Sequence, residues 1–264
     1  MLIDFTDKVV VVTGGARGIG RVIAKTFAAE HALVVVCDVS AAELADLHAE
    51  VPAIAVMVCD VASTDQVRAV VAEIDRRYGR VDVLVNNAGI NVEGRLEELG
   101  DEAWTRCFDV NVGGVFRMCR EVSPIMKRQR GGRIINAASF AAIIPSVASS
   151  AYAASKAAVV QLTRVLAGEL GPWNVTVNAY APGMVPTSMN GFAELDGGAQ
   201  AKLLDTLTLR RWETPEDVAR LVCFIASEAA SYITGTLIDV SGGKLATQMP
   251  SRSYDSFLAS RVRD

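Results

Sequence analysis

The sequence has almost no histidine and few cysteines. The two histidines, His31 and His48, do not lie in a Cys/His cluster with the spacing of metal ligands. The five cysteines are scattered and odd in number, which is typical of reduced thiols in a cytoplasmic compartment. A zinc-dependent mechanism therefore lacks its ligands, and we expect no metal site.

Long apolar runs and an excess of positive charge are also missing. No apolar stretch approaches the roughly 20 residues that a membrane span needs, and the N-terminus has no basic segment followed by an apolar one. The formal net charge is −4, which gives no electrostatic argument for binding nucleic acid or an anionic membrane surface. We expect a cytoplasmic protein that binds a small-molecule substrate, with no nucleic acid and no membrane as partners.

The sequence does contain an alternation of short β-branched runs with longer segments of helical period. Its 264 residues are 51% apolar, enough for one domain with a sizeable core. The runs 9–12 and 34–36 consist of valine alone, which is typical of strands covered on both faces of a sheet. Alternating strands and helices predict parallel strands with right-handed crossovers. We predict one α/β domain over residues 1–243, a doubly wound Rossmann-like parallel sheet of about seven strands.

The expected elements follow this alternation along the chain. Strands are predicted at 8–12, 33–37, 54–58, 82–85, 133–136, 175–179 and 237–239. Helices are predicted at 18–30, 41–49, 64–78, 152–170 and 215–226, with one long helical stretch at about 102–129. Residues near 184–210 are predicted to form a substrate lid that ligand orders. A frayed end is the ordinary interpretation of the C-terminal tail, 244–264, and our hypothesis is that this tail packs on a neighbouring subunit.

A glycine-rich turn, residues 13–20, joins the first strand to the first helix. Gly14 allows a tight turn, Gly18 lets the backbone approach a pyrophosphate, and Gly20 lets the helix pack close to the sheet. The N-terminus of the helix then offers free N–H groups to phosphate. The spacing GxxxGxG differs from the GxGxxG of most dinucleotide folds, and an ordinary glycine-rich turn is the alternative. The same turn supplies two more candidate cofactor contacts, Arg17 and Ile19.

Asp38 ends the second strand, 18 residues after Gly20, near the distance expected for the acid that binds the adenosine ribose. A carboxylate there accepts both ribose hydroxyls of NAD and repels the 2′-phosphate of NADP. Arg17 has the opposite effect, because a cation in this turn can meet a 2′-phosphate. We favour Asp38 and therefore NAD, and a simple helix cap before Ala41 is the alternative role for this acid. The ends of the third and fourth strands add candidate cofactor contacts, with polar turns as the alternative: Asp60, Val61, Asn87, Ala88 and Gly89.

A tyrosine and a lysine lie one helical turn apart after the fifth strand. The spacing of four places Tyr152 and Lys156 on one face of the helix. Ser139 lies 13 residues before Tyr152, just past the C-terminal end of the strand, where ligands of open α/β sheets bind. A phenol is a poor base at neutral pH, and a nearby ammonium and a positively charged nicotinamide both favour the phenolate. The three residues predict proton exchange with an alcohol, with Tyr152 as general acid/base.

In their order along the chain, these motifs resemble those of the short-chain dehydrogenase/reductase family. The resemblance rests on the glycine turn, Asn86–Gly89, Asn111, Ser139, Tyr152-x-x-x-Lys156 and Pro182-Gly183-x-x-x-Thr187. It implies that Asn111 kinks its helix and holds a water that links Lys156 to solvent. It also implies a homotetramer, and nicotinamide contacts from a segment whose candidates are Pro182, Gly183, Val185 and Thr187. The alternatives are a capping role for Asn111, a simple turn at 182–183 and a structural turn at Ser139.

The sequence says less about the substrate than about the cofactor and the catalytic residues. The residues expected to line its site mix polar and apolar groups: Asn91, Ala141, Ser149, Met184 and Met189. The first hypothesis is an NAD-dependent oxidoreductase that interconverts a secondary alcohol (a sugar, polyol or hydroxy acid) and its ketone. The second is an NADPH-dependent reductase of 3-oxoacyl thioesters, for which a small basic patch is available, also explained as a solvated helix end: Lys127, Arg128, Arg130 and Arg133. A cofactor-binding regulator without turnover is a third hypothesis, against which the complete set of catalytic residues argues.

Overall fold

The computed structural model describes residues 3–187 and 191–254. These residues form one sheet in which all neighbouring strands are parallel, in the order β3-β2-β1-β4-β5-β6-β7. The strands are β1 (Val9–Thr13), β2 (Leu33–Asp38), β3 (Ala55–Val58), β4 (Val83–Asn86), β5 (Gly132–Ala137), β6 (Val175–Ala181) and β7 (Leu237–Asp239). The prediction of a doubly wound parallel sheet of about seven strands is confirmed.

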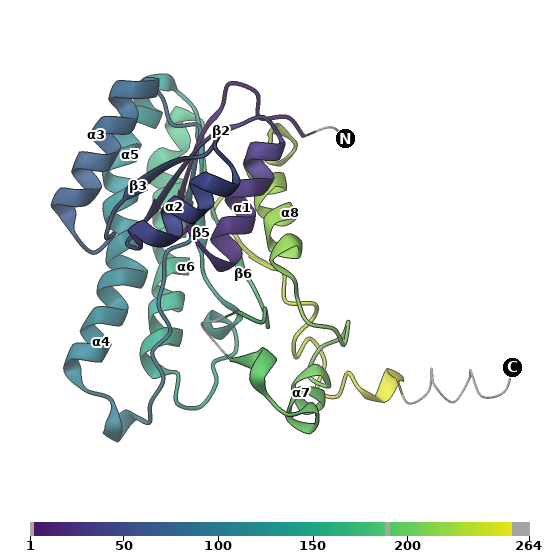
Figure 1. Ribbon diagram of the computed structural model, residues 1–264. Coiled ribbons are helices and arrows are strands. Elements are labelled where there is room, and N and C mark those ends of the chain that lie inside the picture. The colour runs from purple at the N-terminus through teal and green to yellow at the C-terminus, as the bar shows by residue number, and fades with distance from the viewer. Residues whose placement is uncertain (1–2, 188–190, 255–264) are drawn as a thin grey trace, which may run out of the picture.

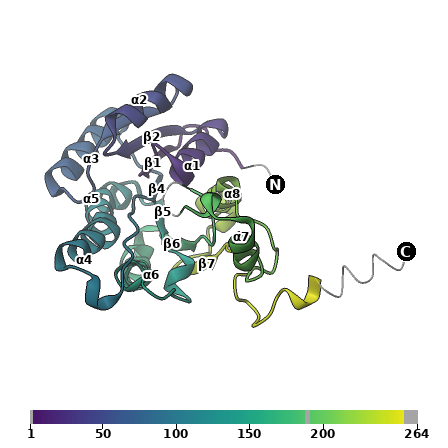
Figure 2. The same ribbon diagram turned by 60° about the horizontal axis from the view of Figure 1, so that its bottom comes forward.

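Helices cover both faces of this sheet (Figures 1 and 2). On one face lie α1 (Gly18–Ala29), α2 (Ala41–Glu50) and α8 (Pro215–Ala226). On the other face lie α3 (Thr64–Tyr78), α5 (Gly114–Gln129) and α6 (Ser150–Leu170). The boundaries of these elements differ from the predicted ones by two residues or fewer, apart from the long helical stretch.

The valines of β1 show why a continuous apolar run suits this architecture. Val9 and Val11 point into the core beneath α3 and α5, whereas Val10 and Val12 point into the core beneath α1 and α8. All four side chains are 1% exposed or less. Because side chains alternate along a strand, both faces must be apolar when both are covered by helices.

The long helix predicted at about 102–129 is divided into three parts. The structure has α4 (Asp101–Phe108), a π-helical turn (Asp109–Gly113) and then α5. Asn111 lies in the π-helical turn, which takes one more residue per turn than an α-helix. The helix is therefore interrupted at the residue for which the family resemblance implies a kink.

The segment after β6 contains a helix that the sequence pattern did not predict, α7 (Gly197–Leu204). The Asp196 side chain caps it by accepting hydrogen bonds from the N–H groups of Gly198 and Ala199, both at 2.9 Å. Short 3₁₀ turns occupy Leu96–Glu98, Phe140–Ala142, Gly171–Trp173, Phe192–Glu194 and Glu228–Ala230. The expected ordering of this region by ligand stays a prediction, and residues 188–190 lie outside the described part of the chain.

The described part of the C-terminal tail lies against its own chain, near α7 (Figure 1). The Leu245 N–H donates to the Thr206 carbonyl oxygen at 2.9 Å. The Tyr254 hydroxyl donates to the Thr208 carbonyl oxygen at 2.8 Å. Residues 255–264 lie outside the described residues, and contact of the tail with a neighbouring subunit stays a prediction.

Within residues 3–187 and 191–254, no helix combines the length and apolarity that crossing a membrane requires. In the same ranges, no three His, Cys, Asp or Glu side chains gather as a metal site would require. The five cysteines are all buried and free.

Candidate functional site

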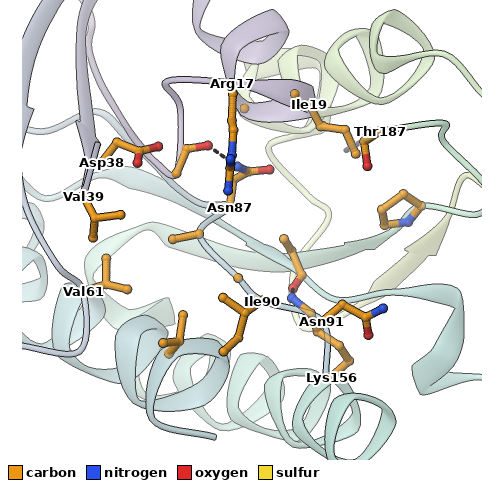
Figure 3. Close-up of a pocket in the computed structure, with 18 of the residues that line it drawn as sticks. Arg17, Ile19, Asp38, Val39, Val61, Asn87, Ile90, Asn91, Lys156 and Thr187 are labelled. Carbon is orange, nitrogen blue, oxygen red and sulfur yellow. Dashed lines mark hydrogen bonds between the residues drawn. The ribbon is translucent and has the colours of Figure 1, made fainter. Parts of the chain in front are cut away.

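A cavity of about 520 Å³ lies along the C-terminal ends of the strands. It is centred where β1 has β2 on one side and β4 on the other, the point at which the strand order reverses. Figure 3 shows Asp38 and Val61 at one end of the cavity and Lys156, Asn91 and Thr187 at the other. Most of the predicted cofactor residues and two of the predicted catalytic residues, Tyr152 and Lys156, therefore meet in one cavity, whereas Asn111 and Ser139 do not line it.

The glycine turn forms the floor of this cavity beside α1. A Cβ at Gly20 would lie 2.2 Å from the Gly14 carbonyl oxygen, so only glycine fits. Gly18 has a φ of +54° and nothing within 4 Å of the place where a Cβ would be, so its backbone is both left-handed and open. The α1 N-terminus has no side-chain cap and no acid in its first turn. Its N–H groups are thus available to an anionic ligand such as a pyrophosphate.

Asp38 faces the cavity from the end of β2. Its carboxylate accepts hydrogen bonds from the N–H groups of Ala16 (3.1 Å) and Ser40 (3.2 Å), which fix its orientation. The cap of α2 is Ser40, whose hydroxyl accepts from the Glu43 N–H. The alternative that Asp38 itself caps this helix is therefore wrong.

The two cations near this end of the cavity are both drawn toward acids. Arg17 lies 3.4 Å from a carboxylate oxygen of Glu43, on the first turn of α2. Arg106 lies 3.2 Å from a carboxylate oxygen of Asp60, at the end of β3. The electrostatic support that either arginine offers to an additional phosphate is reduced by its partner.

Asn87 links the two halves of the cavity floor. Its amide N–H groups donate to the carbonyl oxygens of Thr13 (3.2 Å) and Gly14 (2.8 Å). Its amide oxygen accepts a 3.1 Å hydrogen bond from the hydroxyl of Tyr180, a buried residue of β6. Asn87 therefore fixes the glycine turn against the ends of β4 and β6, in addition to lining the cavity.

Ser139, Tyr152 and Lys156 come together at the other end. Ser139 lies near the Tyr152 hydroxyl, close enough to influence the pKa of that phenol. The Lys156 ammonium lies 5.7 Å from the centre of the Tyr152 ring and donates to the Ala137 carbonyl oxygen at 2.8 Å. The Ser139 hydroxyl accepts the Ala141 N–H at 3.1 Å, so the structural turn considered as an alternative is present.

Burial dominates the acid–base properties of this group. Burial raises the pKa of Tyr152, and the nearby Ser139 hydroxyl opposes that rise. Burial also lowers the pKa of Lys156 to about 8. A nearby ammonium was expected to lower the pKa of the phenol, but without a bound cofactor the pKa of Tyr152 is raised instead. The reason is that desolvation disfavours the charged forms of both groups.

Asn111 connects the π-helical turn to the strand end next to it. Its amide nitrogen donates to the Ile90 carbonyl oxygen and to the Ser155 hydroxyl, both at 3.0 Å. Its amide oxygen accepts the Ile90 N–H at 2.8 Å. These partners leave no hydrogen bond from the Asn111 amide to its own helix backbone, so the capping alternative is not observed. A Cβ at Gly89 would lie 3.2 Å from both the Asn111 amide oxygen and the Lys156 ammonium, so glycine keeps the space between these polar groups open.

Most of the predicted cofactor contacts line the cavity: Gly14, Arg17, Gly18, Ile19, Gly20, Asp38, Asp60, Val61, Asn87, Ala88, Gly89, Tyr152, Lys156, Pro182 and Thr187. Two do not. The Gly183 N–H is directed to the carboxylate of Glu213 at 2.6 Å, and Val185 is 3% exposed. Residues that line the cavity without having been predicted as cofactor contacts are at strand ends or on α4 and its π-helical turn: Val39, Cys59, Ile90, Asn91, Arg106, Val110, Ala137, Ala138 and Tyr180.

The predicted substrate residues are scattered. Asn91 lines the cavity and donates to Glu93 at 2.8 Å. Ser149 is buried and donates to the Ser146 carbonyl oxygen, and Met184 is 1% exposed. Ala141 lies in the 3₁₀ turn after Ser139. Met189 lies outside the described residues.

Comparisons with known proteins identify relatives that match most of the chain. A family model described as enoyl-(acyl carrier protein) reductase matches residues 14–244. The 3-oxoacyl-(acyl-carrier-protein) reductase FabG of Thermotoga maritima is 39% identical over 240 residues, covering 89% of this chain and 97% of the relative. The NAD-dependent glycerol dehydrogenase of Listeria innocua is 36% identical over 243 residues, covering 91% and 94%.

A solved structure also matches most of the chain. The crystal structure of gox2181 superposes with a TM-score of 0.89 at 31% sequence identity, covering 93% of this chain and 98% of that one. The match therefore extends over nearly the whole fold. The chain belongs to the short-chain dehydrogenase/reductase family of oxidoreductases.

Proposed function

We propose that this protein is an NAD(H)-dependent oxidoreductase that interconverts a secondary alcohol, such as a sugar, polyol or hydroxy acid, and its ketone. One observation carries the proposal: Asp38 and the Tyr152–Lys156 pair lie at opposite ends of a single cavity. The first suits the adenosine ribose of NAD, and the second suits proton exchange with an alcohol.

The fit of the cofactor rests on the glycine turn. Gly14, Gly18 and Gly20 leave a cradle beside an α1 N-terminus that has neither an acid nor a side-chain cap. The pyrophosphate would lie there, the adenosine ribose at Asp38, and the nicotinamide beside Pro182 and Thr187. When bound, the nicotinamide supplies the hydride acceptor in alcohol oxidation and the hydride donor in ketone reduction.

The protein supplies the proton transfer. In the oxidation direction the Tyr152 phenolate accepts the hydroxyl proton of the alcohol, and in reduction the phenol returns it. Ser139 donates a hydrogen bond to the substrate oxygen and holds it beside Tyr152. The Lys156 ammonium lowers the cost of the phenolate and bonds the ribose hydroxyls. As the family resemblance implies, Asn111 holds a water through which Lys156 exchanges protons with solvent.

The preference for NAD over NADP follows from the charges at the far end. The Asp38 carboxylate repels a 2′-phosphate, and the next residue, Val39, brings no cation. Arg17 could offset this, but Glu43 lies 3.4 Å from its guanidinium. The acids at this end of the cavity therefore outweigh the two arginines that are paired with them.

Side-by-side titration with NADH and NADPH tests this proposal, using wild type, Asp38→Ala and the control Asp46→Ala. Asp46 is an exposed residue of α2. We expect wild type and Asp46→Ala to bind NADH at least tenfold more tightly than NADPH, and Asp38→Ala to lose most of that difference. NADPH preference in the wild type would contradict the assignment of Asp38 as the selector.

A second candidate is supported by the names of several relatives, which are 3-oxoacyl-(acyl-carrier-protein) reductases. The basic patch considered for a carrier-protein partner gives it little support. Arg133 is buried, and Arg128 pairs with Asp75 at 2.5 Å. Lys127 lies over the Trp173 ring at 4.2 Å. This candidate would be favoured if the protein reduced an acetoacetyl thioester with NADPH faster than it reduced, with NADH, the ketone corresponding to any polyol or hydroxy acid.

We also propose a homotetrameric cytoplasmic enzyme, as the family resemblance implies. Large apolar side chains are exposed on α4 and α5, where Trp104 is 39% and Phe116 is 48% exposed. Exposed apolar side chains on neighbouring helices favour contact with another subunit. Light scattering of the purified protein gives the subunit number, and a monomer would contradict the proposal.

A further inference from the structure

Glu213 is a buried acid in the loop between α7 and α8, and it does not itself line the cavity. One carboxylate oxygen accepts the Gly183 N–H at 2.6 Å. The Glu213 N–H donates to the Met184 carbonyl oxygen at 3.2 Å. One residue thus holds two consecutive residues of the segment that follows β6.

This segment is confined from two other directions. A Cβ at Gly183 would lie 2.8 Å from the Ser241 Cα and Cβ atoms, so the chain passes close to the end of β7. The Pro182 carbonyl oxygen accepts the N–H of Phe140, the residue after Ser139, at 3.0 Å. Pro182 itself lines the cavity. A movement of Glu213 would therefore change the position of the cavity wall at Pro182 and of the turn that carries Ser139.

The second carboxylate oxygen of Glu213 is buried and has no hydrogen-bond partner within the described residues. A buried carboxyl oxygen without a partner is costly, whichever protonation state the group adopts. Accepting a single backbone N–H requires only a neutral oxygen, which a glutamine would provide. A purely structural role as a hydrogen-bond acceptor therefore does not explain why an ionisable group occupies this position.

Within the described part of the chain, no cation forms an ion pair with Glu213. Arg211 pairs with Asp217 at 2.6 Å, and Asp217 and Asp239 both repel the Glu213 carboxylate. The Tyr180 hydroxyl lies close enough to sense its charge. Burial, with the smaller repulsion from the two aspartates, raises the pKa of Glu213 to about 8 against the opposing effects of the Gly183 N–H and Arg211.

We propose that Glu213 is a positioning residue that fixes the Gly183–Met184 segment at the nicotinamide end of the cavity and couples the choice between oxidised and reduced cofactor to its own proton. The inference rests on the proposed function, because the nicotinamide end is defined by it. An ionised Glu213 places a negative charge behind that end of the cavity. A negative charge favours the positively charged oxidised ring over the neutral reduced one, whereas the protonated acid favours neither.

Binding of NAD⁺ and NADH between pH 6 and 9.5 tests the proposal in wild type, Glu213→Gln and the control Glu216→Gln. Glu216 is exposed and lies three residues away on α8. The quantity measured is the ratio of the NADH and NAD⁺ dissociation constants. Lys156 ionises in the same pH range, so the difference between wild type and Glu213→Gln isolates the contribution of Glu213.

We expect the ratio in wild type and Glu216→Gln to rise about three- to tenfold more than in Glu213→Gln as the pH passes through about 8. Glu213→Asp keeps an ionisable group but does not reach the Gly183 N–H, so both forms of the cofactor should bind more weakly. Equal ratios in wild type and Glu213→Gln at every pH would overturn the inference while leaving the proposed function intact. Failure of wild type to bind either form would overturn the proposed function and the inference with it.

Thermal unfolding gives a second measurement that does not depend on turnover. The pKa of Glu213 is raised from 4.5 to about 8 on folding, so the unfolded chain releases this proton first as the pH rises. Wild type should therefore lose stability relative to Glu213→Gln between about pH 4.5 and 8, with a constant difference above pH 8. A melting-temperature difference that does not change with pH across this window would contradict a titrating Glu213.

Discussion

The Lys156 ammonium donates a 2.8 Å hydrogen bond to the carbonyl oxygen of Ala137, the last residue of β5. This single bond holds the charge where the strand ends and the helix that carries Tyr152 begins. Lys156 is buried, and burial lowers its pKa to about 8. A charge kept at a cost in stability and directed into a cavity is typical of a functional group.

Lys156→Met is therefore expected to abolish turnover and to stabilise the fold at pH 7. The lysine pKa falls from 10.5 to about 8 on folding, so the folded state holds this proton less firmly than the unfolded chain. The wild type is penalised at pH 7 by at most about 3 kcal/mol, and the penalty fades as the pH rises from about 8 to 10.5. Melting temperatures at pH 7 and pH 10 measure the effect, and a lower value for Lys156→Met at pH 7 would contradict it.

Tyr152→Phe removes only the phenol hydroxyl and should separate chemistry from binding. Loss of a general acid/base lowers kcat by about 10²- to 10⁴-fold, while the affinity for NADH should change little. Tyr232→Phe is the matched control, because that tyrosine is fully exposed on the surface. The proposed role of Tyr152 fails if the phenylalanine variant keeps more than about a tenth of wild-type kcat.

Two glycine-to-alanine changes should have opposite effects on stability. At Gly20 a Cβ would meet the Gly14 carbonyl oxygen at 2.2 Å and the Asn87 amide at 2.4 Å, so Gly20→Ala should unfold the turn or abolish NADH binding. At Gly168, inside α6, nothing lies within 4 Å of a new Cβ. Gly168→Ala should stabilise the protein by about 0.5–1 kcal/mol. Denaturant titration of both variants measures the change in the free energy of unfolding, and NADH binding is measured for Gly20→Ala as well. Equal changes of the same sign in the two variants would refute the prediction.

The sequence predicted the elements whose signals are local. The valine runs and the glycine turn each lie within a few residues, so strands β1 and β2 and the start of α1 could be located from pattern alone. The π-helical turn at Asp109–Gly113 could not, because apolar periodicity continues through one inserted residue. The helix α7 begins with two glycines, which favour a loop, and its formation depends on the cap provided by Asp196.

The part of the site that escaped prediction depends on contacts between distant residues. Glu213 reaches Gly183 across 30 positions of sequence, and the Tyr180 hydroxyl reaches Asn87 across 93. No spacing rule brings such pairs together, since the sheet order and the loop after β6 decide their distance. The motif residues were predictable because the family's chemistry places them at strand ends, and their supporting contacts were not.

The C-terminal tail offers the last test, because its described part supports the segment after α7. The Tyr254 hydroxyl donates to the Thr208 carbonyl oxygen at 2.8 Å, and the Arg210 guanidinium lies 5.3 Å from the centre of the Tyr254 ring. Deletion of residues 251–264 removes both contacts. We expect the KM for substrate to rise several-fold with little change in NADH affinity, because the lost support lies beyond the cofactor cavity.

Tyr254→Phe is the matched variant for this deletion, since it keeps the ring beside Arg210 and loses only the hydroxyl bond. A neutral hydrogen bond at an exposed site contributes about 1 kcal/mol or less, so its KM should lie between those of wild type and the deletion. Light scattering on the same samples separates support within one subunit from packing on a neighbour. A smaller assembly after deletion would support the packing hypothesis, whereas unchanged KM and unchanged mass would show that the tail serves neither purpose.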